Sequence, residues 1–359
     1  MKPVAPALQS LPPGVTRPAD YEARARAILG DDAWAYFSAH AGDGQTVRAN
    51  RAAWAALALQ PRVLRGLRSI DTTTVLLGSS LPSPLLVAPM ALQRLAHPDG
   101  EVAMAAAAAA LGAGFILSSQ ASQPMESIAA AFLPDRHRGP LWFQLYLLPQ
   151  RAATLELVRR AEAAGCEALV LTVDAAVRAA RPLRLPPDVL PVNLPPTSAP
   201  GGTLQDLLAL APAWEDVAWL RSVTRLPVLL KGVLHPADAA EAVRQGVAGV
   251  IVSNHGGRVL DGAVATATAL PAVVAAVERR IPVLVDGGVQ GGTDVLKALA
   301  LGAGGVLVGR PLLWGLAAAG AAGAAHVLRL LRDELELAMA QCGAGAIAQL
   351  DGSLLASGA

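Results

Sequence analysis

The chain has 359 residues, of which 53% are hydrophobic and 16% charged, and its formal net charge is +1. This length and apolar content are enough to bury a sizeable core, which excludes general disorder. Because the net charge is close to zero and basic residues form no run with interleaved aromatics, the sequence does not predict nucleic-acid binding.

The two cysteines, Cys166 and Cys342, have no CxxC or Cys/His ligand spacing, so neither a disulfide framework nor a metal site is expected. The first 25 residues lack the continuous apolar core of a signal peptide. The most apolar runs, 104–118 and 311–328, are short and interrupted, and they predict core segments instead of membrane spans. We therefore expect a cytoplasmic protein that contacts no membrane.

The pattern along the chain predicts one domain over residues 1–359, in which an N-terminal helical extension (about 19–60) precedes alternating strands and helices. Residues 19–40 read as one or two helices, and later helices are expected at 98–111, 149–164, 236–245, 293–301 and 311–342. Eight short apolar runs are predicted strands: 84–89, 114–119, 141–146, 168–174, 227–232, 249–257, 282–288 and 305–311.

Eight buried strands that alternate with helices favour an α/β fold of the (β/α)8 TIM-barrel type. A doubly wound open sheet is the structural alternative, but it normally has fewer strands, and no GxGxxG motif follows an early strand. Residues 175–213, after the fourth strand, are rich in proline and too long for an ordinary connection. This segment is the predicted lid.

The carboxyl ends of barrel strands carry the functional residues, and here they bring polar groups to one rim. His255 and Arg258 follow the sixth strand, where a histidine can act as a base and a guanidinium can hold a carboxylate. Asp174 can orient that imidazole, and Lys231, in an apolar run, requires an anionic partner. The turns DGGVQGGTD (286–294) and VGRP (308–311) each lead into a helix, as a phosphate site does.

These motifs resemble the family of FMN-dependent L-2-hydroxy acid oxidases and dehydrogenases, which includes glycolate oxidase, lactate oxidase and mandelate dehydrogenase. The resemblance extends from about Asp20 to about Cys342. Its most specific element is SNHGGRVLDG (253–262), close to the family signature SNHGGRQLDG. The segments WFQLY, LTVD, LPVLLKG, VAPMALQRLAHPDGE, LVDGGV, GTDVLKALALGA and VGRP match in order and spacing.

The resemblance implies that His255 is the catalytic base, partnered by Asp174, and that Lys231 lies beside the flavin N1 and O2 edge. It implies catalytic and substrate-binding roles for the tyrosines Tyr36 and Tyr146. The predicted substrate-binding residues also include Arg258, Arg181 and Gln120. The implied FMN shell comprises Pro89, Met90, Ala91, Ser118, Gln144, Thr172, Lys231, Ser253, Asp286, Gly287, Gly288, Gln290, Gly309 and Arg310.

The implied reaction is oxidation of an L-2-hydroxy acid to the 2-oxo acid, with His255 taking a proton and flavin N5 accepting two electrons. Reoxidation by O2 would give H2O2, the reaction of an (S)-2-hydroxy-acid oxidase. No fused haem domain or membrane insertion is visible, which favours O2 over a quinone or another acceptor. The family also suggests a homotetramer.

Several positions depart from the family pattern. The phosphate turn carries Gln290 and Gly291 where arginines are common, so we expect FMN to bind with Arg310 supplying more of the phosphate contact. His40 stands where glycine is usual, and Gln120 where several members have tryptophan. The altered segment after Arg181 also leaves Arg178 as a competitor for its role. The shortened lid suggests a pocket that admits a bulkier, aromatic acid.

Two other functions remain open at this point. Another FMN barrel, such as an isomerase that uses reduced flavin, would not need the pair His255 and Arg258. A degenerate barrel that binds a phosphate ligand without catalysis is suggested by the changes at Gln290 and Gly291, although every catalytic position is present.

Overall fold

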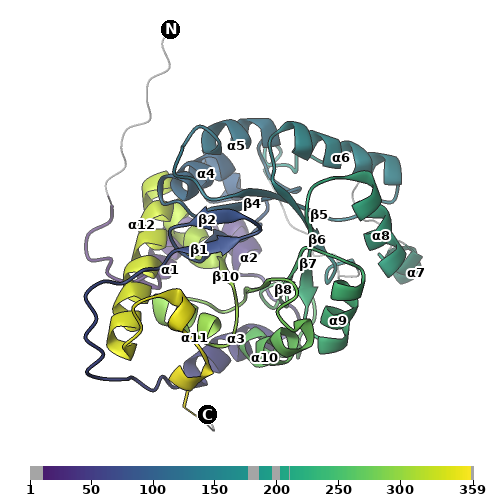
Figure 1. Ribbon diagram of the computed structural model, residues 1–359. Coiled ribbons are helices and arrows are strands. Elements are labelled where there is room, and N and C mark those ends of the chain that lie inside the picture. The colour runs from purple at the N-terminus through teal and green to yellow at the C-terminus, as the bar shows by residue number, and fades with distance from the viewer. Residues whose placement is uncertain (1–10, 177–185, 196–202, 210, 357–359) are drawn as a thin grey trace.

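The fold is a closed barrel of eight parallel strands surrounded by helices (Figure 1). The structure is a computed structural model that describes residues 11–176, 186–195, 203–209 and 211–356. The neighbouring strands run in the order β10-β3-β4-β5-β6-β7-β8-β9. Their bounds are β3 (Leu85–Val87), β4 (Gly114–Ser118), β5 (Leu141–Leu145), β6 (Ala168–Thr172), β7 (Val228–Val233), β8 (Gly249–Val252), β9 (Val283–Val285) and β10 (Gly305–Val308). The predicted TIM barrel and all eight strands are confirmed, and the open sheet is wrong.

The strands are almost continuously apolar because both of their faces are buried. One face points into the barrel, where Leu86, Ile116, Trp142 and Ile251 belong to a single apolar cluster. The alternate residues, such as Val87 and Phe115, belong to the larger cluster between the barrel and its helices. The barrel is therefore a packed core, and ligands must bind at its ends.

A two-stranded hairpin that the sequence analysis missed precedes the barrel. Strands β1 (Thr74–Leu76) and β2 (Ser79–Leu81) pair antiparallel across a turn in which Leu77 and Gly78 have φ of 47° and 84°. Figure 1 shows the hairpin in front of the barrel opening. Leu76 and Leu81 are buried in the interior cluster, so the hairpin closes the amino-terminal end of the barrel.

Helices cover the outside of the barrel. They are α4 (Gly100–Ala110), α5 (Met125–Phe132), α6 (Arg151–Ala163), α7 (Leu204–Ala209), α8 (Trp214–Val223), α9 (Pro236–Arg244), α10 (Thr266–Val277), α11 (Gly292–Ala300) and α12 (Arg310–Cys342), with short 3₁₀ turns η1 (Gln93–Leu95), η2 (Ile347–Gln349) and η3 (Gly352–Leu354). The expected helices at 98–111, 149–164, 236–245, 293–301 and 311–342 match α4, α6, α9, α11 and α12. Helices α5, α7, α8 and α10 were not predicted.

Helix α12 is the longest, and it bends at Ala319 and Gly320, whose backbone angles are not helical. Across this bend the backbone of Gly315 meets that of Gly323 so closely that a side chain would not fit at either glycine. Of the helices in the described ranges, α12 alone is long and apolar enough to cross a membrane, but 72% of its most apolar window is buried in the fold. This burial is what a core helix shows.

The N-terminal extension forms three helices, α1 (Asp20–Ile28), α2 (Asp31–Ser38) and α3 (Gln45–Ala56), so residues 19–40 contain two helices. The start of helix α3 and the turn before it are fastened to the loop after β8 by two sets of contacts, of which the pair between Asn50 and Asn254 is buried. Asp261 accepts hydrogen bonds from the backbone N–H groups of Asp43 and Thr46, and the side-chain amides of Asn50 and Asn254 bond to each other at 2.9 and 2.8 Å. The extension thus lies beside the carboxyl ends of the barrel strands.

The predicted lid is described in part. Asn193 is buried, accepts a hydrogen bond from Met125 N at 2.9 Å and donates one to the Gln123 carbonyl. Arg94 donates to Asp188, through the backbone carbonyl at 2.7 Å and the carboxylate at 3.0 Å. The described part of the lid is therefore held to the loops that follow β3 and β4.

Candidate active site

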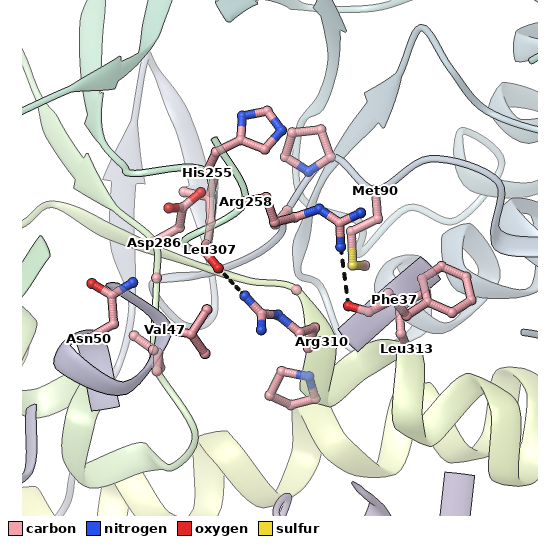
Figure 2. A pocket seen from close by; sticks show the side chains of 18 of the residues that line it. Phe37, Val47, Asn50, Met90, His255, Arg258, Asp286, Leu307, Arg310 and Leu313 are labelled. Atoms are coloured by element: carbon pink, nitrogen blue, oxygen red, sulfur yellow. Dashed lines mark hydrogen bonds between the residues drawn. The ribbon is translucent and has the colours of Figure 1, made fainter. Parts of the chain in front are cut away.

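A deep cavity opens at the carboxyl end of the barrel, and its volume is about 1380 Å³ with the solvent at its mouth included. Figure 2 shows that side chains from the strand ends and from the N-terminal helices point into it. The predicted site residues among its lining are Tyr36, Pro89, Met90, Ala91, Ser118, Gln120, Gln144, Tyr146, Thr172, Lys231, His255, Arg258, Asp286, Gly287, Gly288, Gln290, Gly309 and Arg310. One cavity therefore brings together almost the whole predicted site.

His255 forms a close pair with Asp174. Its Nδ1 lies 2.9 Å from Asp174 Oδ1, and both side chains are largely buried, with 17% and 14% exposed. The residue has a left-handed backbone (φ 56°), held by a hydrogen bond from its own N–H to Ser253 Oγ. Because Nδ1 is engaged by the carboxylate, Nε2 is the nitrogen left for chemistry in the cavity.

Burial and the nearby Lys231 charge keep the His255 imidazole neutral. Burial lowers the pKa of His255 below its usual value, and the Lys231 charge adds to this, while the Asp174 hydrogen bond partly opposes it. Burial alone would raise the pKa of Asp174, but the hydrogen bond from His255 and the charge of Lys231 outweigh it and lower that pKa. At neutral pH the pair is a neutral imidazole beside a carboxylate, the state in which a histidine accepts a proton.

Lys231 is buried at the cavity, and its ammonium group contacts two polar side chains. Its Nζ is 3.0 Å from Asp286 Oδ2 and 2.9 Å from Ser253 Oγ. Burial alone would lower the pKa of Lys231, but the charges of Asp286 and Asp174 raise it above its usual value. Lys231 is therefore a fixed positive charge at neutral pH, and Ser253, which does not line the cavity itself, orients it.

Three polar side chains form a hydrogen-bonded row across neighbouring strand ends. Ser118 Oγ donates to Gln144 Oε1 at 3.2 Å, and Gln144 Nε2 donates to Thr172 Oγ1 at 3.0 Å. All three are buried, on β4, β5 and β6. Ser118 and Gln144 are register partners, and Thr172 lies two residues beyond Val170, the partner of Gln144, so the three side chains share one face of the barrel and line one edge of the cavity.

Arg258 lies across the cavity, close to the end of α2. Its Nη1 donates to the backbone carbonyls of Tyr36 at 2.9 Å and Phe37 at 3.2 Å, and Figure 2 shows the contact with Phe37. The Arg258 guanidinium also lies over the Tyr36 ring. Tyr146 and Gln120 line the same space. Arg181 and its competitor Arg178 lie outside the described residues.

The loops after β9 and β10 form a narrow cationic end of the cavity. Gly287 and Gly288 have φ of 91° and 83°, and a Cβ on Gly288 would meet the backbone of Asn50 at 2.8 to 2.9 Å. Glycine is therefore required at position 288 by both conformation and space. Arg310, at the start of α12, donates to the Gly256 carbonyl, and burial together with the charges of Arg258 and Arg51 lowers the pKa of Arg310 to about 10.

Sequence reasoning missed the contribution of the N-terminal helices. Glu22 on α1 and Asn50 and Arg51 on α3 line the cationic end, and Trp314 on α12 lines the wall. Glu22, Asn50 and Arg51 carry no glycine-rich or paired motif, and at least 34 positions separate them from the first barrel strand. The docking of α3 on the loop after β8 reveals Asn50 and Arg51 as part of the cavity.

The cavity has the groups that a flavin nucleotide requires. Asp286 Oδ1 is buried and, in the described part of the chain, has no hydrogen-bond partner, a costly state that a ligand hydroxyl would relieve. The Lys231 ammonium suits an electron-rich ring edge, and the glycine turns with Arg310 suit a phosphate. The described residues contain no group of three or more His, Cys, Asp or Glu side chains that could hold a metal ion.

Comparison with known proteins agrees with this geometry. Residues 25–357 match the FMN-dependent dehydrogenase family. The chain is 47% identical to L-lactate oxidase of Alicycliphilus denitrificans, covering 95% of this chain and 96% of that protein, and 44% identical to glycolate oxidase 1 of Zea mays, covering 94% of each. A solved structure of mandelate oxidase with (S)-4-hydroxymandelic acid superposes with a TM-score of 0.86 at 41% identity, covering 93% of this chain and 97% of that one. The chain belongs to the FMN-dependent dehydrogenase family, and its cofactor is FMN.

Proposed function

We propose that the protein is an FMN-dependent (S)-2-hydroxy-acid oxidase, which converts an L-2-hydroxy acid and O2 to the 2-oxo acid and H2O2. The observation that carries the proposal is the placement of a base and a carboxylate-binding guanidinium on one short loop. His255, paired with Asp174, and Arg258 line the same cavity beside Lys231. Relatives named L-lactate oxidase and glycolate oxidase, at 47% and 44% identity, support this substrate class.

The substrate is held by its carboxylate. Arg258 offers a planar guanidinium whose donors can bind both carboxylate oxygens, and its orientation is fixed by the Tyr36 and Phe37 carbonyls. The Tyr36 and Tyr146 side chains line the same cavity, and a binding role toward a substrate oxygen is proposed for their hydroxyls. Arg181 remains a proposed second carboxylate ligand on the strength of the resemblance.

His255 is the base in this reaction. Its Nε2 receives one proton from the substrate, and the Asp174 carboxylate stabilises the imidazolium that results. Bound FMN supplies an acceptor for the two electrons that leave the substrate. The Lys231 charge stabilises negative charge that develops nearby, and its partners Ser253 and Asp286 keep it in place.

The cellular location and assembly are proposed on narrower grounds. Cys166 and Cys342 are both free and buried, which supports a cytoplasmic protein. The homotetramer is proposed from the family resemblance. Size determination of the purified holoenzyme by light scattering tests it.

The test of function is an anaerobic titration of the purified holoprotein with L-2-hydroxy acids that differ in side-chain size, followed by the flavin absorbance. Bleaching that reverses on admission of air, with H2O2 formed in equal amount, is the expected result. Bleaching that only an added quinone reverses would indicate a dehydrogenase. Absence of bleaching with every acid would leave a flavin-binding barrel without this activity.

The matched variants are His255→Asn and His235→Asn. Asparagine tolerates the left-handed backbone of position 255, so this substitution removes the base with little strain. His235 caps α9 by accepting from Ala237 N, a role that asparagine also fills. The first variant is expected to bind FMN and lose flavin reduction, and the second to keep both. Unchanged reduction in His255→Asn would remove His255 as the base.

A further inference from the structure

Two arginines from opposite parts of the chain meet at the cationic end of the cavity. Arg51 comes from α3 and Arg310 from the start of α12, and both line the cavity next to the Gly287 and Gly288 turn. They are close enough for the Arg51 charge to lower the pKa of Arg310. Two guanidiniums held near each other repel, and an anion between them removes that cost.

The Arg51 side chain is positioned by two acceptors. With the Gln290 amide oriented to satisfy its surroundings, its Oε1 accepts hydrogen bonds from Arg51 Nε at 2.9 Å and Nη2 at 2.8 Å. Glu22 Oε2 lies 3.3 Å from Nη2. Within the described residues these contacts use Nε and Nη2, so the Nη1 donors remain available to a ligand.

The turn after β9 supplies no charged side chain to an anion, so the contribution of Arg51 is important at this site. Gln290 and Gly291 carry no charge, so the turn itself supplies backbone donors and one amide side chain to an anion. A dianionic phosphate at this end then has Arg310 at the start of α12, while Arg258, the other arginine that the barrel loops bring to the cavity, is bonded to the Tyr36 and Phe37 carbonyls. Arg51 brings a further cation to this end from outside the barrel loops, and the Gln290 carbonyl holds it there.

We propose that Arg51 binds the phosphate group of FMN together with Arg310, and that Gln290 acts as a positioning residue that holds Arg51. The inference rests on the proposed FMN site. It makes the N-terminal helix α3 part of the cofactor site, and it gives Gln290 a function that an arginine at that position would not have.

The test compares binding of FMN with binding of riboflavin, which lacks the phosphate, to the apoprotein by quenching of flavin fluorescence. Because a hydrogen bond to a charged group is worth about 1.5 to 3 kcal/mol, Arg51→Gln is expected to raise the Kd for FMN by about 10- to 100-fold. The Kd for riboflavin should stay within about 2-fold, since the rest of the site is intact. The double variant Arg51→Gln with Gln290→Arg should recover most of the FMN affinity, because the guanidinium then comes from the turn.

The matched control is Arg48→Gln, one turn earlier on α3. Arg48 is bonded to the Asp43 carbonyl at 2.8 Å and does not line the cavity, so removal of the same charge there should leave both Kd values unchanged. If Arg51→Gln fails to fold, Arg51→Lys takes its place, with the same selective loss expected at a smaller size, because an ammonium keeps the charge and loses the paired donors.

Three results would overturn the inference. One is an unchanged Kd for FMN in Arg51→Gln, and another is an equal rise for FMN and riboflavin, which would make Arg51 a structural residue. The third is a loss of FMN affinity in Arg48→Gln equal to that in Arg51→Gln. This result would show that the affinity depends on the net positive charge of α3 and not on a direct contact of Arg51 with the phosphate. Failure of the unaltered apoprotein to bind FMN would overturn the proposed function itself, and that result is obtained before any variant is made.

Discussion

Replacement of Asp174 by asparagine tests the role of the carboxylate in proton transfer. In the unaltered protein an imidazolium formed at His255 lies against a carboxylate whose oxygen is 2.9 Å from Nδ1. Opposite charges about 4 Å apart attract by about 4 kcal/mol at an effective dielectric constant of about 20. A neutral amide would return about 1 kcal/mol through its hydrogen bond, so the net loss is about 3 kcal/mol, on the order of 100-fold in rate.

The assay is stopped-flow measurement of flavin reduction under anaerobic conditions across pH, with Asp206→Asn, a surface substitution of the same kind, as the control. The Asp174 hydrogen bond and charge raise the pKa of His255 against the larger lowering by burial. Removal of that charge must therefore lower this pKa further. The acid limb of the rate profile should move to lower pH while the plateau falls. A plateau at the unaltered rate, or a limb displaced to higher pH, would refute the pairing as the source of catalysis.

Two further predictions concern the frame around the site. Gly288→Ala should destabilise the protein by about 2 to 5 kcal/mol and weaken FMN binding, because it adds a left-handed alanine and a collision with Asn50. Gly262 has nearly the same φ but open space around it, so Gly262→Ala should lower the free energy of unfolding by only about 1 to 2 kcal/mol. Equal losses of stability for Gly288→Ala and Gly262→Ala in urea unfolding would contradict the steric argument. Leu76→Ala leaves a cavity at the amino-terminal end of the barrel, and it should lower the free energy of unfolding by about 2 to 5 kcal/mol. Flavin reduction by the folded holoprotein should be unchanged, because the active site lies at the other end. Loss of flavin reduction in fully folded protein would show that the two ends of the barrel are coupled.

The barrel was predictable because each strand is an uninterrupted apolar run bounded by helix-compatible sequence. The hairpin of β1 and β2 was not, since TVLLGSSL (74–81) is short and its burial depends on a barrel end that exists only after folding. Helix α10 was missed as well, because Pro271 lies inside it and proline argues against a helix interior.

The active site likewise has residues that the local sequence predicts and residues that it does not. His255, Arg258, Asp174 and Lys231 were predictable because each occupies a strand end, and parallel strands bring their carboxyl ends together. Arg51 was not, because its place in the cavity depends on contacts such as that between Asn50 and Asn254, 204 positions apart. Local sequence carries no signal for a tertiary contact of that range.

The cationic end of the cavity is built from segments that lie far apart in the sequence, and this has a consequence for biosynthesis. Helix α3 ends 254 positions before Arg310, so it is synthesised well before that residue. A nascent chain can form strands and pair them in order, but the complete cofactor pocket exists only once the eighth strand and the start of α12 have been made. FMN stabilises the state that it binds by mass action, so it is expected to favour chains in which both parts of the site are present.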